Sequence, residues 1–327
     1  MTAEQFSQLL IEAHAGISST GWHWFAYHFN VGPTPFGKGI IEACAEIDNR
    51  AAGIGTALLR ELTLIGGRDR DEAQYEQLLQ KLGEILVIRQ VLSCPWPTGT
   101  TFCHEPAAIP GGPRPELLVT YDEGRLVVEV KTPALLAHIR NRASNDTQLA
   151  YRGGVSLEVA KGLGTSPVTL PRDNPVLDFL KDGERKFAAF RSDQSTASLL
   201  VIIWDDFIYE PISTLVNPGS GLLTERSYAR GVDGTPQKYP NIDAIAVLRH
   251  LNYFISGSRE EPLGDRTSAM DFGGENALPN VLFASSGARQ VPEFVLNSLR
   301  VFPNDHPELR RWAEYNTQDI VFWIEHP

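Results

Sequence analysis

The chain has 327 residues, of which 42% are hydrophobic and 9% aromatic, so it can bury a core and is not disordered overall. This length suits one large core with extensions or two small cores, but not three ordinary domains. The formal net charge of −11 argues against simple electrostatic binding of nucleic acid, although a local basic groove or a bound metal can outweigh the total.

Neither a membrane span nor a disulfide framework is expected. No apolar run reaches the roughly eighteen residues that a span requires, and the N-terminus lacks the basic and apolar regions of a signal peptide. The three cysteines, Cys44, Cys94 and Cys103, are too few and too scattered for disulfides or for a zinc site. We therefore expect reduced thiols in a cytoplasmic protein.

Residues 1–95 are expected to form a mainly helical N-terminal part. Apolar side chains recur at helical spacing over residues 2–14, and a second helix is expected to end at Gly66 and Gly67. A third helix is predicted over 71–92, because acidic residues precede it, leucines and an isoleucine form one stripe, and prolines follow it.

Residues 96–260 change to strand-like patterns and are expected to form the core. The run 197–207 is the most apolar of them and should be central in a sheet. The other expected elements are a short strand at 100–106, a hairpin over 116–131 with Gly124 in its turn, helices at 133–142 and 174–191, a loop-like segment at 214–240 and a β-rich run at 241–251.

Residues 261–327 are expected to form a C-terminal extension packed on the core. The order of helices and strands along the chain predicts an α/β fold with a mixed central sheet flanked by helices. The extension contains strand-like runs at 280–285, 294–302 and 319–326 and a short helical pattern at 306–315.

Three charged residues of the predicted hairpin share one face of the sheet. A turn at residues 122–125 pairs Glu116 with Lys131 and puts Glu129 on the diagonal, with about 7 Å between the backbones. Leucines, valines and Tyr121 occupy the other face, which should be turned toward the core. A slip of one residue would separate the charges, so the prediction depends on the turn.

This trio of charges predicts a metal site. Two carboxylates about 5 Å apart repel each other by about 3 kcal/mol at an effective dielectric constant of 20, and one lysine leaves the trio at a net charge of −1. A divalent cation would compensate the remaining charge, and carboxylate oxygens suit Mg²⁺ or Mn²⁺. A lysine beside a metal-bound water can orient that water or stabilise charge on an attacked phosphate, so the trio predicts phosphodiester hydrolysis.

The segment RPELLVTYDEGRLVVEVKTP resembles the core of the restriction-endonuclease-like nucleases, whose motif is written PD-(D/E)xK. Pro115 and Glu116 correspond to the PD element, with glutamate in place of the usual aspartate. Glu129, Val130 and Lys131 correspond to (D/E)xK. The resemblance is most specific over residues 99–131 and extends more loosely over 70–250.

The resemblance implies a Mg²⁺-dependent or Mn²⁺-dependent nuclease with a restriction-endonuclease-like core. Glu116 and Glu129 would bind the metal, the backbone carbonyl of Val130 would be a further ligand, and Lys131 would assist the attacking water. DNA is the expected substrate, and a homodimer would suit cleavage of both strands.

Two other functions fit part of the same pattern. The longer side chain of Glu116 and the net negative charge suit a nuclease fold that is kept as a scaffold or binding module with a degenerate site. A carboxylate-pair enzyme such as a glycosidase would explain two acids. It gives Lys131 no role, however, and it predicts sugar-binding aromatic residues around the site, of which few flank the hairpin.

Several residues outside the motif are weaker candidates for the site. On the 71–92 helix, Glu72, Glu76 and Glu84 could add an acid, but all three lie off the apolar stripe, which favours a solvated face. Three further sets are candidates, each with a structural alternative: Glu105 at a strand end, Gln148 and Tyr151 as a glutamine–tyrosine element, and Arg140, Arg142 and Arg152 as phosphate contacts. For His23 and His28, packing in the interior is favoured over metal binding. For Asp205 and Asp206, a turn at the end of a strand is favoured over metal binding.

Overall fold

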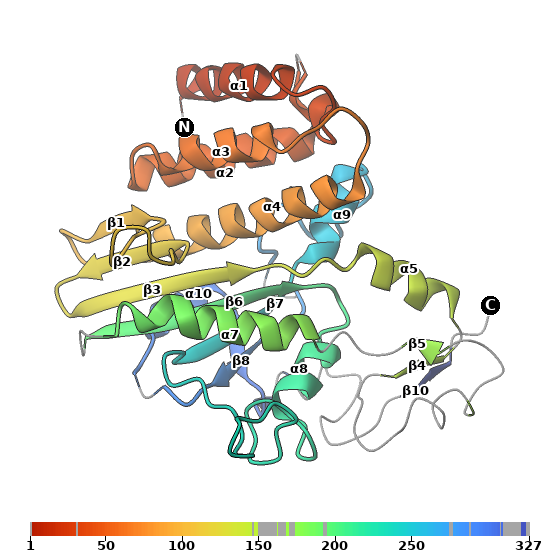
Figure 1. Cartoon of the computed structure of the whole chain (residues 1–327). Helices are drawn as coiled ribbons and strands as arrows, with labels where there is room; N and C mark the ends of the chain where they lie inside the picture. The colour runs from red at the N-terminus through yellow and green to blue at the C-terminus, as the bar shows by residue number, and fades with distance from the viewer. Residues whose placement is uncertain are drawn as a thin grey trace.

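The computed structural model is an α/β fold in which helices flank a mixed seven-stranded sheet (Figure 1). It describes residues 2–30, 32–145, 147–149, 162, 168–169, 174–191, 195–274, 277–287, 289–307, 309 and 322–324. The helices are α1 (Ala3–Ser18), the short 3₁₀ helix η1 (Ala26–Phe29), α2 (Pro35–Arg50), α3 (Ile54–Leu64), α4 (Glu72–Leu92), α5 (Leu136–Ser144), α7 (Asn174–Ala188), α8 (Tyr209–Val216), α9 (Leu251–Ser258) and α10 (Glu293–Ser298).

The main sheet has the strand order β1-β2-β3-β6-β7-β8-β9. Strand β6 is therefore central, as its apolar sequence predicted, and all nine of its residues are buried. Strands β3, β6 and β7 run parallel, whereas β1, β2 and β3 form an antiparallel meander. The strands are β1 (Thr101–His104), β2 (Leu117–Tyr121), β3 (Gly124–Lys131), β6 (Thr196–Trp204), β7 (Ala244–Arg249), β8 (Asn280–Ala284) and β9 (Val301–Pro303).

Helices α4 and α7 cover opposite faces of the sheet at β3. Gly83 of α4 lies against Thr132 and Ile203, whereas Gly183 of α7 lies against Leu200. Glu129 pairs with Leu200 across the β3–β6 ladder, so these two side chains share the α7 face. Alternation along the strand then assigns Glu129 to the α7 face and Thr132 to the α4 face.

The N-terminal helices pack on α4 and not directly on the sheet. In Figure 1, α1, α2 and α3 lie in layers beyond α4, and contacts link α2 and α3 to it. The core-facing side of α4 includes Leu78, Leu82 and Ile85, all fully buried, as its predicted stripe required. This packing joins the helical part and the sheet in one hydrophobic core.

The C-terminal part contributes strands to the same sheet. Strands β8 and β9 continue the main sheet at its far edge, whereas β10 (Phe322–Ile324) pairs with β4 (Thr147–Leu149) in a separate three-stranded sheet that also contains β5 (Val168–Thr169). The expected strand at 294–302 is wrong in its first half, because residues 293–298 form α10 and only 301–303 form a strand. Most of the helix predicted at 306–315 lies outside the described residues.

The three cysteines are free thiols, as expected: Cys44 and Cys94 are buried and Cys103 is exposed. Among the described helices, none combines the length and the apolar character that a membrane crossing would need.

Replacing Gly83 by alanine is expected to destabilise the protein. A Cβ atom at this position would lie 2.6 Å from Thr132 Oγ1 and 3.1 Å from Ile203 Cγ1. Overpacking costs about 1–3 kcal/mol, which outweighs the gain of at most about 1 kcal/mol that alanine brings to a helix.

Gly183 on the opposite face is the matched control. A Cβ atom there would meet its nearest neighbours at 3.5 Å and 3.6 Å, which is ordinary contact, so Gly183→Ala should stabilise the protein by about 0.5–1 kcal/mol. Urea unfolding measures both variants. Equal stabilisation by the two substitutions would show that α4 can move away from β3.

Candidate functional site

The β2–β3 hairpin has a tighter turn than predicted. Tyr121 pairs with Gly124 and Leu117 with Val128, so the turn consists of only Asp122 and Glu123. The predicted pairing of Glu116 with Lys131 is therefore wrong by two residues. A shift of two keeps every side chain on its predicted face.

Glu116 immediately precedes β2, and the observed register, continued by one pair, sets it beside Glu129 and not beside Lys131. Its backbone carbonyl accepts a hydrogen bond from the amide of Glu105 at 3.1 Å. The two carboxylates of the predicted trio are therefore closer neighbours in the sheet than the sequence indicated.

Glu129 is the most deeply buried of the three charged side chains Glu116, Glu129 and Lys131. Its side chain is 0% exposed, and its Oε1 atom lies 2.7 Å from Lys131 Nζ and 2.6 Å from Lys186 Nζ. Its Oε2 atom is also buried but has no hydrogen-bond partner. A buried carboxylate oxygen without a partner costs free energy, and a bound cation would satisfy it.

Lys131 links the hairpin to α7. Its Nζ atom lies 2.7 Å from both Glu129 Oε1 and Asp182 Oδ2. Burial disfavours its charge, but Glu129 and Asp182 outweigh burial and raise the pKa of Lys131. The lysine of the motif is therefore a charged group held between two carboxylates.

Helix α7 supplies two residues of the site that the sequence analysis did not identify, Asp182 and Lys186. Asp182 also pairs with Arg185, and despite partial burial the neighbouring cations lower the pKa of Asp182. Lys186, one turn further along, lies 3.7 Å from Glu116 Oε1 and 3.9 Å from Asp182 Oδ2. One sequence signal could have identified them. A helix that connects two parallel strands crosses over the sheet and turns its apolar face toward it. Asp182 and Lys186 flank the apolar residues of this face, so both lie close to the sheet.

Glu84 of α4 also belongs to this group. Its side chain is 16% exposed and is paired with Lys81, which also lies 2.7 Å from Glu61. Burial raises the pKa of Glu84, and the charge of Glu129 adds to this effect. The expectation of a solvated face is therefore wrong for Glu84, because this side chain lies where α4 approaches the hairpin.

The electrostatics of Glu116 follow from its neighbours. Burial, reinforced by the charges of Glu84 and Glu129, raises the pKa of Glu116 to about 8, although Lys186 and Lys81 act in the opposite direction. Glu116 therefore holds its proton to a higher pH than an exposed glutamate does. We call Glu84, Glu116, Glu129, Asp182, Lys81, Lys131 and Lys186 the Glu129 cluster.

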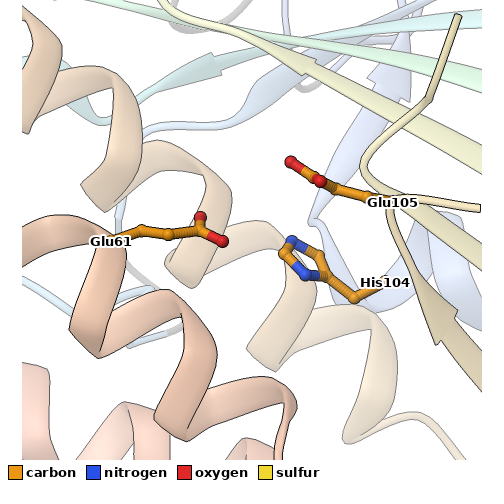
Figure 2. A group of neighbouring side chains, drawn as sticks. All are labelled: Glu61, His104 and Glu105. Carbon is orange, nitrogen blue, oxygen red and sulfur yellow. The ribbon is translucent and has the colours of Figure 1, made fainter. Parts of the chain in front are cut away.

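A second group of side chains, of types that could bind a metal, lies next to this cluster. One ligand atom from each of Glu61, His104 and Glu105 lies within 4.8 Å of the others, and Figure 2 shows the imidazole facing the two carboxylates. Burial lowers the pKa of His104, and its Nε2 atom is buried without a hydrogen-bond partner. Both carboxylates already have a cation nearby, since Glu61 pairs with Lys81 and Glu105 lies 3.8 Å from Arg114.

The remaining candidates on α4 and α5 are engaged elsewhere. Glu72 is exposed and forms an ion pair with Arg140, which is itself 61% exposed, while Glu76 accepts a hydrogen bond from the amide of Leu136. Arg142 is not a surface charge, because it is buried and pairs with Asp205.

Other candidates have structural roles or lie outside the described residues. His23 and His28 are buried and hydrogen-bonded to Leu62 and Ser258, in agreement with packing. Asp205 accepts a hydrogen bond from the Phe207 amide after β6, as a strand-end turn predicts, and Asp206 accepts one from Asn252. Gln148 is placed on β4, and Tyr151 and Arg152 lie outside the described residues.

The donor types of the Glu129 cluster suit a hard divalent cation, but its carboxylate oxygens would have to draw together to bind one. Among the described residues, only Glu61, His104 and Glu105 bring three ligand atoms within 4.8 Å of one another. Glu84, Glu116 and Glu129 offer carboxylate oxygens, which Mg²⁺ and Mn²⁺ prefer, and one buried oxygen of Glu129 has no partner. Val130 lies between Glu129 and Lys131 on β3, and its carbonyl remains a predicted ligand.

The metal-free wild type is expected to lose stability as the pH rises, because of Glu116. The Glu116→Gln substitution should remove this loss, because glutamine has no proton to release. The pKa of Glu116 rises from 4.5 to about 8 on folding. Between these values the folded state keeps a proton that the unfolded chain has lost, so stability falls as pH rises, by at most about 1.4 kcal/mol per pH unit.

Thermal unfolding in the presence of a chelator, at about pH 5 and about pH 9, measures this difference. The Tm of the wild type minus the Tm of Glu116→Gln should be smaller at about pH 9 than at about pH 5. Glu225→Gln, at a side chain that is 86% exposed, should follow the wild type at both values. An equal difference between wild type and Glu116→Gln at both pH values would contradict the prediction.

Comparisons with known proteins do not assign this chain to a family. No family model matches it, and no match was found among curated proteins or solved structures.

Proposed function

We propose that the chain is a metal-dependent nuclease of the restriction-endonuclease-like type, which hydrolyses phosphodiester bonds in DNA in the cytoplasm. The observation that carries the proposal is the buried carboxylate of Glu129, which contacts Lys131 and has one oxygen without a partner. An acid and a lysine two residues apart on one strand, next to the acid that precedes β2, form the arrangement that the PD-(D/E)xK motif predicts.

Glu116 and Glu129 would hold Mg²⁺ or Mn²⁺, with the carbonyl of Val130 as a further ligand. A bound cation at such a site lowers the pKa of a coordinated water and stabilises negative charge on the phosphate. Because cation binding favours the ionised form of Glu116, it would oppose the raised pKa of this carboxyl.

Lys131 is the residue proposed to orient the attacking water. Asp182 holds the ammonium group from the α7 side, so the lysine keeps one partner even when Glu129 binds a cation. A charged donor that is fixed before the substrate binds stabilises developing charge without reorganisation.

Exposed cations lie near the cluster, although the net charge of the chain is −11. Arg185 is 61% exposed and Lys181 is also exposed on α7, and Arg114 is 54% exposed in the loop before Glu116. These side chains would contact backbone phosphates, which position a nucleic acid without reading its sequence. A homodimer would present two such sites to the two strands of a duplex.

A catalytically degenerate scaffold is the second candidate, and one observation favours it. Glu129 Oε1 already lies within 2.7 Å of two ammonium groups, so the cluster is largely compensated without a metal. This candidate predicts that titration calorimetry detects no binding of Mg²⁺ or Mn²⁺, whereas the nuclease predicts binding that Glu129→Gln abolishes.

Lys131→Met and Glu129→Gln are each expected to reduce DNA cleavage by about 10²–10³-fold, because each removes a group that acts on the transition state or its metal. Cleavage of supercoiled and linear duplex DNA with Mg²⁺ measures the effect, and single-stranded DNA and RNA test the substrate. Lys38→Met, at a side chain 58% exposed on α2, is the matched control and should cleave like the wild type. Cleavage that persists in both site variants would rule out this site as its source.

A further inference from the structure

Lys186 occupies the position of a counter-ion for the two acids of the motif. Its Nζ atom lies 2.6 Å from Glu129 Oε1 and 3.7 Å from Glu116 Oε1, so one ammonium group contacts one carboxylate and lies near the other. Its side chain is only 15% exposed, so water screens these interactions weakly. A divalent cation bound by the same two carboxylates would be strongly repelled by an ammonium group at this position.

Asp182 offers Lys186 another partner on the same helix. The two residues are one turn apart on α7, and Asp182 Oδ2 already lies 3.9 Å from Lys186 Nζ. Lysine has a flexible stem, so its ammonium group can shift from Glu129 toward Asp182 without movement of the helix.

We propose that Lys186 is an internal counter-ion, which stabilises Glu116 and Glu129 in the metal-free protein and is displaced toward Asp182 when a divalent cation binds. This inference rests on the proposed metal site. The role of Lys186 differs from that of Lys131. Lys131 contacts Glu129 and Asp182 at the same time, with Asp182 at 2.7 Å. Lys186 lies 3.9 Å from Asp182 and can approach it more closely only by moving away from Glu129. The affinity of the site for metal is then set by competition with a residue of the chain itself.

Titration calorimetry with Mn²⁺ on the full chain tests the competition. Lys186→Met removes the competing charge and should bind Mn²⁺ roughly tenfold more tightly than the wild type. Lys186→Arg keeps the charge and should remain within about twofold of the wild type. Asp182→Asn removes the alternative partner and should weaken Mn²⁺ binding, which is the opposite direction.

Lys38→Met is the matched control for the loss of one positive charge. Lys38 lies on α2, its side chain is 58% exposed and its ion-pair partner is Glu42. This variant should bind Mn²⁺ within about twofold of the wild type. An equal gain in affinity for Lys38→Met and Lys186→Met would reduce the effect to net charge and overturn the proposal.

The remaining outcomes separate this inference from the proposed function. If the wild type binds Mn²⁺, Glu129→Gln abolishes binding and Lys186→Met binds no more tightly, the metal site stands and the role of Lys186 is overturned. If neither the wild type nor Lys186→Met binds Mn²⁺, both proposals fail.

Thermal unfolding gives a second measure and a check on folding. Metal-free Lys186→Met should have a lower Tm than the wild type, because the two acids lose their counter-ion, and Mn²⁺ should raise its Tm by more than it raises that of the wild type. Lys186→Gln serves as the alternative variant if the methionine variant does not fold, with the same expected direction. A smaller Mn²⁺ effect in these variants would contradict the proposal.

Discussion

The need to pair a buried negative charge governs the centre of this molecule. Glu129 lies on a strand that is covered on both sides, and its side chain is fully buried. An ionised carboxylate in such a place is tolerated only if cations or hydrogen-bond donors surround it. The fold meets this need with Lys131 from the same strand and Lys186 from the helix above it.

The charges around Glu129 are arranged differently from those of a simple ion pair. Two ammonium groups converge on one oxygen of Glu129, while the other oxygen has no partner and Glu116 and Glu84 lie nearby with raised pKa values. A cluster built only for stability would be expected to use the second oxygen as well, because an unsatisfied buried acceptor is costly. Perturbed carboxylates gathered around an unpaired oxygen are typical of functional sites.

Much of the fold was predictable because it depends on local patterns. The helical stripe of α4, the apolar run of β6 and the alternation along β3 each follow from neighbouring residues, and each is observed. Side chains of a strand alternate between the two faces of the sheet. The predicted register is wrong by two residues, and a shift of two leaves Glu116, Glu129 and Lys131 on the same face.

What the sequence did not reveal depends on tertiary structure. Asp182 and Lys186 resemble any charged pair on a helix until the crossover between β3 and β6 places α7 over Glu129. Glu84 looked solvated because it lies off the apolar stripe, yet α4 approaches the sheet through Gly83 and brings its neighbour to the hairpin. The short apolar run of α10 fits the period of a strand as well as that of a helix, so the sequence alone predicts a strand there.

The parallel pairing of β3 with β6 has a consequence for how the protein acquires its site. Lys131 and Asp182 are 51 residues apart in the chain, and Glu129 and Lys186 are 57 apart. Contacts of this separation form late, because a long loop must close before they contribute. During synthesis the hairpin emerges with its charges in water, and the cluster is assembled only when α7 docks. Substitutions in the cluster should therefore act mainly on the rate at which the native protein opens, and little on the rate at which the chain folds.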